Sequence, residues 1–288
     1  MNAQPFYGDF FGLAERPFTL LPDPGFLFWS KPHQRAFAML EYGLMTGAPV
    51  TLITGEIGAG KTTLLQALLA RVETDITVGL ISNAQGGRGE LLQWVLHAFD
   101  IPSSPDTPYV QNFRLLQNFL IDEYANGRRC LLIVDEAQNL SVEGLEEVRM
   151  LTNINTNKDE LIQLILVGQP ELRDIIRAPE MRQLAQRVAA SFHLPAMDPE
   201  TVAEYIAHRL RTAGGRGDEI SPGIALRIHS LTGGVPRLVN QLCDLALTYA
   251  WVSEQAQVTE ETIAAVLEDG VFFAAGTHPE AEGHKERP

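Results

Sequence analysis

Basic residues are scarce in this sequence. Lysine and arginine together number 22, against 36 aspartates and glutamates, which gives a formal net charge of −14. Lysine itself stands only at Lys31, Lys61, Lys158 and Lys285. A protein that holds nucleic acid mainly through its phosphates needs a basic patch, so this balance disfavours DNA binding as the principal task. The scattered arginines leave room for a local patch.

Cysteines, long apolar runs and targeting signals are rare or missing as well. Cys130 and Cys243 match no metal-ligand spacing, and we expect two reduced, buried thiols. The N-terminal MNAQPFYGDFFG does not have the pattern of a signal peptide, in which a basic segment precedes a long apolar run. Apolar stretches such as CLLIV and LIQLILVG are too short to cross a bilayer. We therefore expect a cytoplasmic protein without a transmembrane segment, which would reach the inner membrane only peripherally, through a partner.

The sequence does contain an alternation of short apolar runs and helical stretches over residues 49–195. With 288 residues, of which 45% are apolar, the chain is long enough for two domains. The apolar runs predict strands at 50–54, 76–82, 130–135, 161–168 and 190–194. Continuous apolar strands joined by helices predict an α/β fold, with a parallel sheet covered by helices on both faces.

Three other segments flank this α/β core. Residues 1–48 hold an arm rich in aromatics and proline and then an amphipathic helix that ends at Gly47, and we expect both to pack on the core. Residues 196–270 predict a small all-helical domain, with cap residues at Asp198, Ser221 and Thr259. Residues 271–288 form a polar tail that is expected to be disordered.

A phosphate-binding loop is predicted at GEIGAGKT, residues 55–62, which matches the P-loop pattern G-x-x-x-x-G-K-[ST]. Its glycines let the turn expose successive backbone N–H groups, and the following helix adds the positive end of its dipole. Lys61 is expected to reach the outer phosphates, and Thr62 to ligate Mg²⁺. The residues expected to bind nucleotide here are Gly55, Glu56, Ile57, Gly58, Ala59, Gly60, Lys61, Thr62 and Thr63.

Two carboxylates follow a later strand, in CLLIVDEAQ. Strand ends of a parallel sheet converge where ligands bind, so Asp135 is expected to hold Mg²⁺ and Glu136 to act as general base toward the attacking water. Binding alone does not require the second acid. Glu136 therefore favours hydrolysis over a nucleotide-dependent scaffold with negligible turnover.

At these residues the chain resembles AAA+ ATPases, and in particular the ExeA/GspA-like family of general secretion pathway ATPases. The resemblance covers about residues 5–268 and includes RPFTLLPDPGFLFWS, LIVDEAQNL, LILVGQPELRD and GGVPRLVNQLCDLAL. It implies an ATPase that uses ATP and Mg²⁺ and whose helical domain acts as a lid. Longer members carry a transmembrane segment and a peptidoglycan-binding part after the ATPase module. Only a short polar tail follows here, so we expect a short form of the family.

The resemblance also implies three roles for side chains outside the two motifs. Gln169 occupies the position of the polar sensor that touches the γ-phosphate and the attacking water. Arg237, in GGVPR, matches the second sensor, an arginine that reaches back from the lid to the nucleotide. The arginine finger, which acts on the ATP of a neighbouring subunit, is assigned to Arg187, with Arg182 as the alternative.

Two further positions are matched less closely. Asn83, at the end of the second predicted strand, is either a switch that holds Glu136 away from water or a plain strand-end cap. The arm around Arg16, Pro17 and Phe18 matches the region that covers the adenine, and Phe18 is the residue expected to contact the base.

The function implied is that of an ATPase which forms homo-oligomers on binding ATP. It would serve as a motor or switch for an envelope process, such as secretion, pilus assembly or exopolysaccharide export, with a protein of that system as partner. The alternative is a DNA-binding regulator of transposition, since TniB- and TnsC-like ATPases resemble this module too. Filaments on DNA need phosphate-neutralising basic residues, which this acidic chain has in small number.

Overall fold

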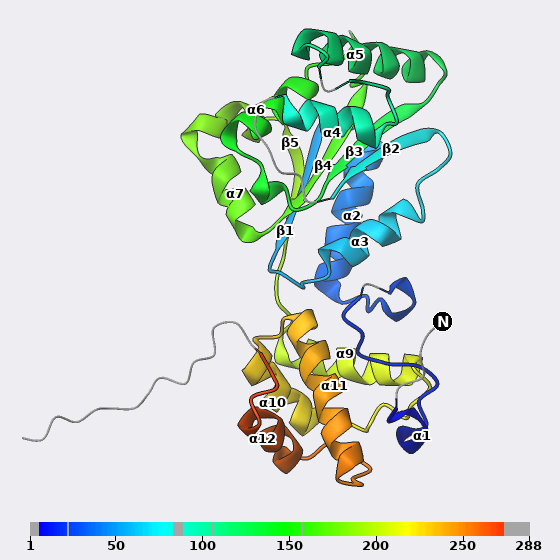
Figure 1. Cartoon of the computed structure of the whole chain (residues 1–288), viewed down its shortest axis with the longest axis vertical. Helices are drawn as coiled ribbons and strands as arrows, with labels where there is room; N and C mark the ends of the chain where they lie inside the picture. The colour runs from blue at the N-terminus through cyan, green and yellow to red at the C-terminus, as the bar shows by residue number, and fades with distance from the viewer. Residues whose placement is uncertain (1–5, 22, 83–88, 105, 157, 274–288) are drawn as a thin grey trace, which may run out of the picture. The chain divides into compact units, whose positions relative to one another are not determined.

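The chain forms two units in the computed structural model, which describes residues 6–21, 23–82, 89–104, 106–156 and 158–273. An α/β unit comprises Trp29–Pro195, and a helical unit combines Met1–Phe28 with Ala196–Pro288 (Figure 1). The chain leaves the α/β unit after Pro195, where the sequence changes from alternating strands and helices to helices alone.

A five-stranded sheet in the order β2-β3-β4-β1-β5 forms the centre of the α/β unit, and every neighbouring pair is parallel. This confirms the predicted fold class, and each of the five predicted runs forms a strand. Because the strands run in one direction, the C-terminal ends of β3, β4 and β1 lie next to one another at the same edge of the sheet. The strands are β1 (Val50–Gly55), β2 (Ile76–Ile81), β3 (Arg129–Val134), β4 (Ile162–Gly168) and β5 (Val188–Leu194).

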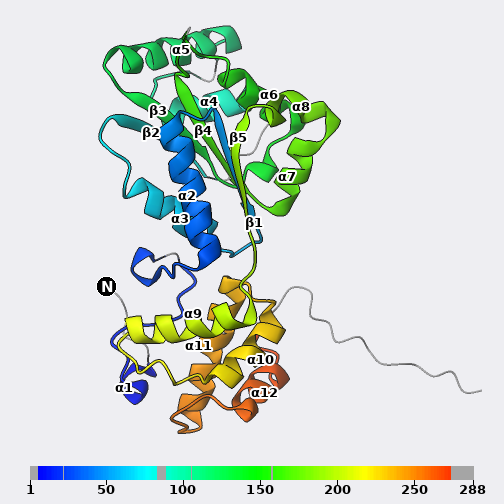
Figure 2. The ribbon, with the colours of Figure 1, turned by 180° about the vertical axis from the view of Figure 1, so that it is seen from behind.

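Helices cover both faces of this sheet (Figures 1 and 2). Successive side chains of β3 alternate between the two faces, with Leu131 and Ile133 packed in one apolar cluster and Leu132 in the other. The first cluster contains α2 and α3, and the second contains α4 to α8. The helices are α2 (Lys31–Thr46), α3 (Lys61–Leu69), α4 (Glu90–Ala98), α5 (Tyr109–Ala125), α6 (Val142–Leu151), α7 (Pro170–Arg177) and α8 (Arg182–Ala185), with short 3-10 turns η2 (Ala137–Asn139) and η3 (Pro179–Met181).

Four helices and the N-terminal arm build the helical unit. The predicted caps are present: the side chains of Asp198 and Ser221 accept from the backbone N–H groups of Thr201 and Ile224, and Thr259 forms a capping box with Thr262. The elements are α1 (Gly8–Phe11), η1 (Pro24–Phe26), α9 (Pro199–Thr212), α10 (Pro222–Thr232), α11 (Pro236–Val252) and α12 (Glu260–Glu268). In the described ranges no helix is both long and apolar enough to cross a membrane.

The described part of the arm, residues 6–21 and 23–28, packs in the helical unit, which corrects this part of the expectation that residues 1–48 pack on the α/β core. Phe18 is 1% exposed inside the apolar cluster of α9 to α12. The carbonyls on either side of it are held by two buried side chains: Arg209 Nε donates to Pro17 O, and Asn240 Nδ2 donates to Thr19 O at 3.1 Å. The arm therefore packs where buried side chains donate hydrogen bonds to its backbone carbonyls. The spacing of its aromatic residues does not reveal where those donors lie.

Asp244 on α11 holds an earlier part of the same arm. Its carboxylate accepts from the Tyr7 hydroxyl and pairs with Arg16. Burial, together with the charge of Asp244, raises the pKa of Tyr7 far above its usual value, so the phenol stays a donor. Both cysteines are buried free thiols, as predicted, and burial raises the pKa of Cys130 to about 12.

Candidate active site

The loop between β1 and α3 has the backbone geometry that a phosphate cradle needs. Gly58 and Gly60 adopt positive φ values of 80° and 98°, which residues with a Cβ rarely take. Gly60 also caps α3, and because it has no side chain, the first N–H groups of that helix receive no side-chain cap. Free N–H groups at a helix start attract anions such as phosphate.

Lys61 is the first residue of α3, and its side chain, which turns back to this loop, is 6% exposed. Its Nζ donates to the carbonyl oxygens of Gly55 at 2.7 Å and Glu56 at 2.9 Å. Burial lowers the pKa of Lys61, against the opposing effect of the Glu136 and Asp135 carboxylates. Two of the three ammonium donors are used by these carbonyls, and within the described ranges the third remains for a phosphate oxygen.

Thr62 and Asp135 come together from α3 and the end of β3. The Thr62 hydroxyl donates to Asp135 Oδ2 at 3.4 Å, and Asp135 is 9% exposed. Burial raises the pKa of the Asp135 carboxyl, so a nearby cation would stabilise its charged form. A hydroxyl and a carboxylate are hard oxygen ligands of the kind that Mg²⁺ takes when phosphates and water supply the rest. The pair fits that ion.

Glu136 and Gln169, which follow β3 and β4, also contact each other. Gln169 Nε2 donates to Glu136 Oε2 at 3.4 Å. Glu136 itself has a φ of 53°, an uncommon backbone conformation for a residue with a side chain. Such strain is concentrated at functional sites, where the surrounding structure maintains it.

Sequence reasoning missed two residues of this site. Gln138 donates to Glu136 Oε2 at 2.6 Å and accepts from the backbone N–H of Gln169 at 3.0 Å. His33, on α2, is 7% exposed and lies 3.2 Å from the carbonyl oxygen of Ala59 in the P-loop. Gln138 could have been suspected from its place two residues after Glu136, whereas nothing in the sequence connects His33 with the loop.

The imidazole of His33 has a defined orientation. Ser30 Oγ lies 2.7 Å from Nδ1, and Nε2 must carry a proton to bond the Ala59 carbonyl. Burial lowers the pKa of His33, which favours this neutral ring. A trans peptide points its C=O and N–H in opposite directions, so fixing the Ala59 carbonyl toward α2 turns the Gly60 N–H away from α2.

The two arginines considered for the finger differ in their contacts. Arg187 pairs with Glu160 at 3.4 Å and donates to Asn153 Oδ1 at 2.8 Å. Arg182 is exposed at the first residue of α8. Arg237 is exposed at the start of α11 in the helical unit, and Asn83 lies outside the described residues.

Phe18, which the resemblance assigned to the adenine, is buried in the helical core as described above. Its side chain is enclosed by the apolar residues of that core, so its ring has no exposed face on which a base could stack in this structure. The expectation that Phe18 contacts the nucleotide is therefore corrected.

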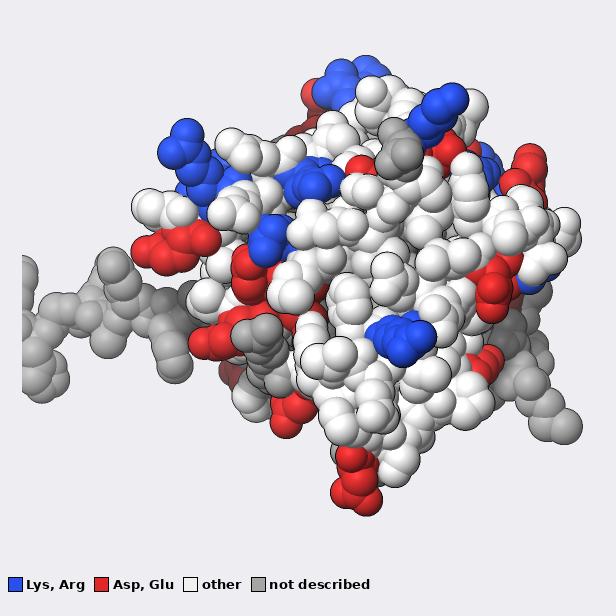
Figure 3. All heavy atoms as spheres, turned by 90° about the horizontal axis from the view of Figure 1, so that it is seen from above, with Lys and Arg blue, Asp and Glu red and all other residues white. Residues whose placement is uncertain are grey.

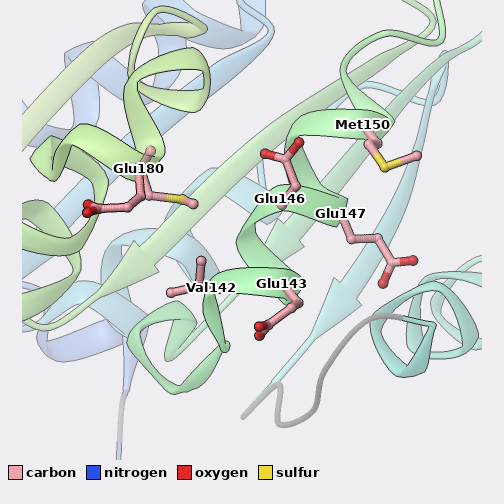
Figure 4. Close-up of a pocket in the computed structure, with 7 residues that line it drawn as sticks. Val142, Glu143, Glu146, Glu147, Met150 and Glu180 are labelled. Atoms are coloured by element: carbon pink, nitrogen blue, oxygen red, sulfur yellow. The ribbon is translucent and has the colours of Figure 1, made fainter.

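A separate cavity of about 410 Å³ lies beside α6 and η3 (Figure 4). Its lining is acidic, with Glu143, Glu146 and Glu147 from α6 and Glu180 from η3. Four carboxylates repel phosphate, so this cavity does not suit the nucleotide.

Comparison with known proteins agrees with this geometry. A family model described as an AAA domain matches residues 44–176. General secretion pathway protein A of Aeromonas hydrophila is 38% identical over 258 residues, which are 90% of this chain and 47% of that protein. The chain thus spans about half the length of this curated relative.

Solved structures share the fold at low identity. Cdc6p of Pyrobaculum aerophilum is 16% identical, with a TM-score of 0.66 over 86% of this chain and 71% of that one. The Aeropyrum pernix ORC1 protein, solved in complex with DNA, is 16% identical, with a TM-score of 0.62 over 88% of this chain and 69% of that one.

The parallel sheet, the P-loop and the acidic strand end define a P-loop NTPase, and the match to the AAA domain model assigns it to the AAA+ class. Within that class the chain belongs with the ExeA/GspA-like proteins, the family of General secretion pathway protein A.

Proposed function

We propose that this chain binds ATP with Mg²⁺ and hydrolyses it to ADP and phosphate. The observation that carries the proposal is the meeting of Lys61, Asp135 and Glu136 at one edge of the sheet. Glu136 accepts a proton from water, the water oxygen attacks the γ-phosphorus, and the bond to the bridging oxygen of ADP breaks. Lys61 offsets the phosphate charge, and the amide of Gln169 orients the reacting groups. Mg²⁺, held by Thr62 and Asp135, would neutralise further charge on the phosphates.

Hydrolysis is proposed to depend on self-association. An arginine from a neighbouring copy would complete the site, which makes turnover sensitive to assembly. A finger must be free to reach another subunit, whereas the Arg187 side chain is held by Glu160 and Asn153. We therefore propose Arg182 for this role in place of Arg187, which the resemblance favoured. Arg237 is proposed to sense the γ-phosphate from the lid.

The cellular role we propose is that of a cytoplasmic motor or switch for an envelope process such as secretion, pilus assembly or exopolysaccharide export. The relation to General secretion pathway protein A supports it. The partner would be a protein of that export system, and contact with the inner membrane would be peripheral.

Binding to DNA is the second candidate, and it is favoured by one observation: the similarly folded ORC1 protein was solved with DNA. The charge opposes it. The chain is acidic, and on the face in Figure 3 blue basic side chains are interspersed with red acidic ones and do not form a continuous basic patch.

Sedimentation with a non-hydrolysable ATP analogue, with and without duplex DNA at two salt concentrations, tests these proposals. We expect oligomers that require the analogue, ignore DNA and persist in the higher salt, and Lys61→Ala should remain in the nucleotide-free state. Oligomers that form only on DNA and dissolve with salt would favour the second candidate.

A further inference from the structure

Gln138 connects Glu136 and Gln169, the two residues that the proposed function places at the attacking water. Its Nε2 donates to Glu136 Oε2 at 2.6 Å, and its Oε1 accepts from the backbone N–H of Gln169 at 3.0 Å. These partners fix the direction of the amide, since only the oxygen can accept from Gln169 and only the nitrogen can donate to a carboxylate. The side chain therefore spans from β3 to the start of α7 in a single orientation.

The backbone on both sides is adapted to this contact. The positive φ of Glu136 starts the 3-10 turn Ala137–Asn139, which brings Gln138 back toward the carboxylate two residues earlier. On the other side, a Cβ at Gly168 would lie 2.7 Å from Gln138 Oε1 and 2.7 Å from Leu172 Cδ2. Any larger residue at position 168 would displace the amide.

The two oxygens of the Glu136 carboxylate differ in their hydrogen bonds. Gln138 and Gln169 both donate to Oε2 of Glu136. Among the described residues Oε1 is left without a donor, so it is the oxygen free to accept a proton. An oriented base of this kind is more effective than a freely rotating one, because small displacements of reacting groups slow catalysis strongly.

We propose that Gln138 is a positioning residue that holds the Glu136 carboxylate with Oε1 toward the attacking water and ties this orientation to Gln169. The inference rests on the proposed ATPase function. It assigns a task to a side chain that the sequence motifs leave unexplained. A shift of the backbone at Gln169 would move the Gln138 amide and, through it, the base.

Four variants, namely Gln138→Leu, Gln138→Glu, Gln169→Leu and the double variant Gln138→Leu/Gln169→Leu, test the proposal by steady-state ATP hydrolysis and by ATP binding. Gln138→Leu removes both bonds, and Gln138→Glu keeps the acceptor for Gln169 but loses the donor to Glu136. We expect both to lower kcat about 10- to 100-fold with less than about a threefold change in the Kd for ATP. Combined with Gln169→Leu, Gln138→Leu should lower kcat by less than the product of the two single effects, because both act on one carboxylate.

Gln117→Leu, the same change at an exposed position of α5, is the matched control and should behave as wild type. A wild-type kcat in Gln138→Leu overturns the inference alone, and a raised kcat shows that the amide restrains the base instead. A loss of affinity for ATP as large as the loss in kcat, or a large fall in Tm, would assign Gln138 a structural role. A wild-type chain that binds ATP without hydrolysing it overturns the proposed function and this inference together.

Discussion

The two units bury polar side chains for different ends. In the helical unit, Arg209, Tyr205 and Asn240 form a chain of hydrogen bonds that finishes on carbonyls of the arm. In the α/β unit, Lys61 and Asp135 are nearly as buried, yet burial shifts the pKa of each toward its neutral form. Each of the first three side chains is hydrogen-bonded within the protein, although Arg209 Nη2 has no partner among the described residues. Lys61 and Asp135 instead lie where a phosphate and a cation would supply the opposite charges.

This difference separates structural from functional side chains. A polar group that the chain already satisfies stabilises the fold, and its loss should lower stability without touching chemistry. Replacing a polar group at the edge of the sheet whose charge the chain leaves uncompensated should instead impair the chemistry without lowering stability. Substitutions at five positions test this comparison.

The largest effect is expected at Arg182. If the exposed arginine is the finger, Arg182→Ala should bind ATP but lose about 10³-fold in turnover. Arg187→Ala, whose side chain is held by Glu160 and Asn153, should keep turnover and lose at most about 1 kcal/mol of stability. Turnover and thermal unfolding of both variants check this. Loss of turnover in Arg187→Ala alone would show that a tied side chain can serve as the finger.

Phe18 should matter only for stability. Phe18→Ala empties a fully buried site of the helical core and should cost about 3–5 kcal/mol in free energy of unfolding. The milder Phe18→Leu should remain folded with an unchanged Kd for ATP. If Phe18→Leu instead weakens ATP binding while GTP binding stays the same, the residue does contact the base.

Both ring nitrogens of His33 have hydrogen-bond partners within the protein, as in the helical unit, yet one partner is a carbonyl of the P-loop. His33 therefore tests whether a fully bonded side chain can still affect nucleotide binding. His33→Leu removes the bond to the Ala59 carbonyl and should weaken ATP binding about tenfold, or about 1.4 kcal/mol. His33→Gln keeps an N–H donor near the Nε2 position and should restore most of the affinity. Equal affinities of all three proteins for a fluorescent ATP analogue would remove His33 from the site.

Substitution of Asp135 should have the smallest effect, and it should raise the stability of the nucleotide-free protein instead of lowering it. Burial raises its pKa, so the folded chain binds this proton more tightly than the unfolded chain, and the group lowers stability as pH rises above about 4. Nucleotide-free Asp135→Asn should therefore melt higher than wild type at pH 7, by a margin that shrinks toward pH 4. The same variant should lose the stabilisation by ATP and Mg²⁺. A lower Tm at pH 7 would mean that Asp135 is structurally satisfied.

The sequence predicts those parts of the molecule that local patterns specify. The five strands, the helix caps and the glycine-rich turn before Lys61 depend on residues close in the chain. The destination of the arm depends on contacts such as Pro17 with Arg209, far apart in sequence, and aromatic content alone says that Phe18 is buried but not where. Gln138 and His33 gain their roles only from neighbours that the fold brings to them.

The central claim is that the edge of the sheet at Lys61, Asp135 and Glu136 hydrolyses ATP. Single-turnover hydrolysis by wild type and Glu136→Gln, alongside ATP binding with Mg²⁺, tests it most directly. We predict that Glu136→Gln binds ATP within about threefold of wild type and hydrolyses it at least about 10²-fold more slowly. Wild-type turnover in Glu136→Gln would contradict the account.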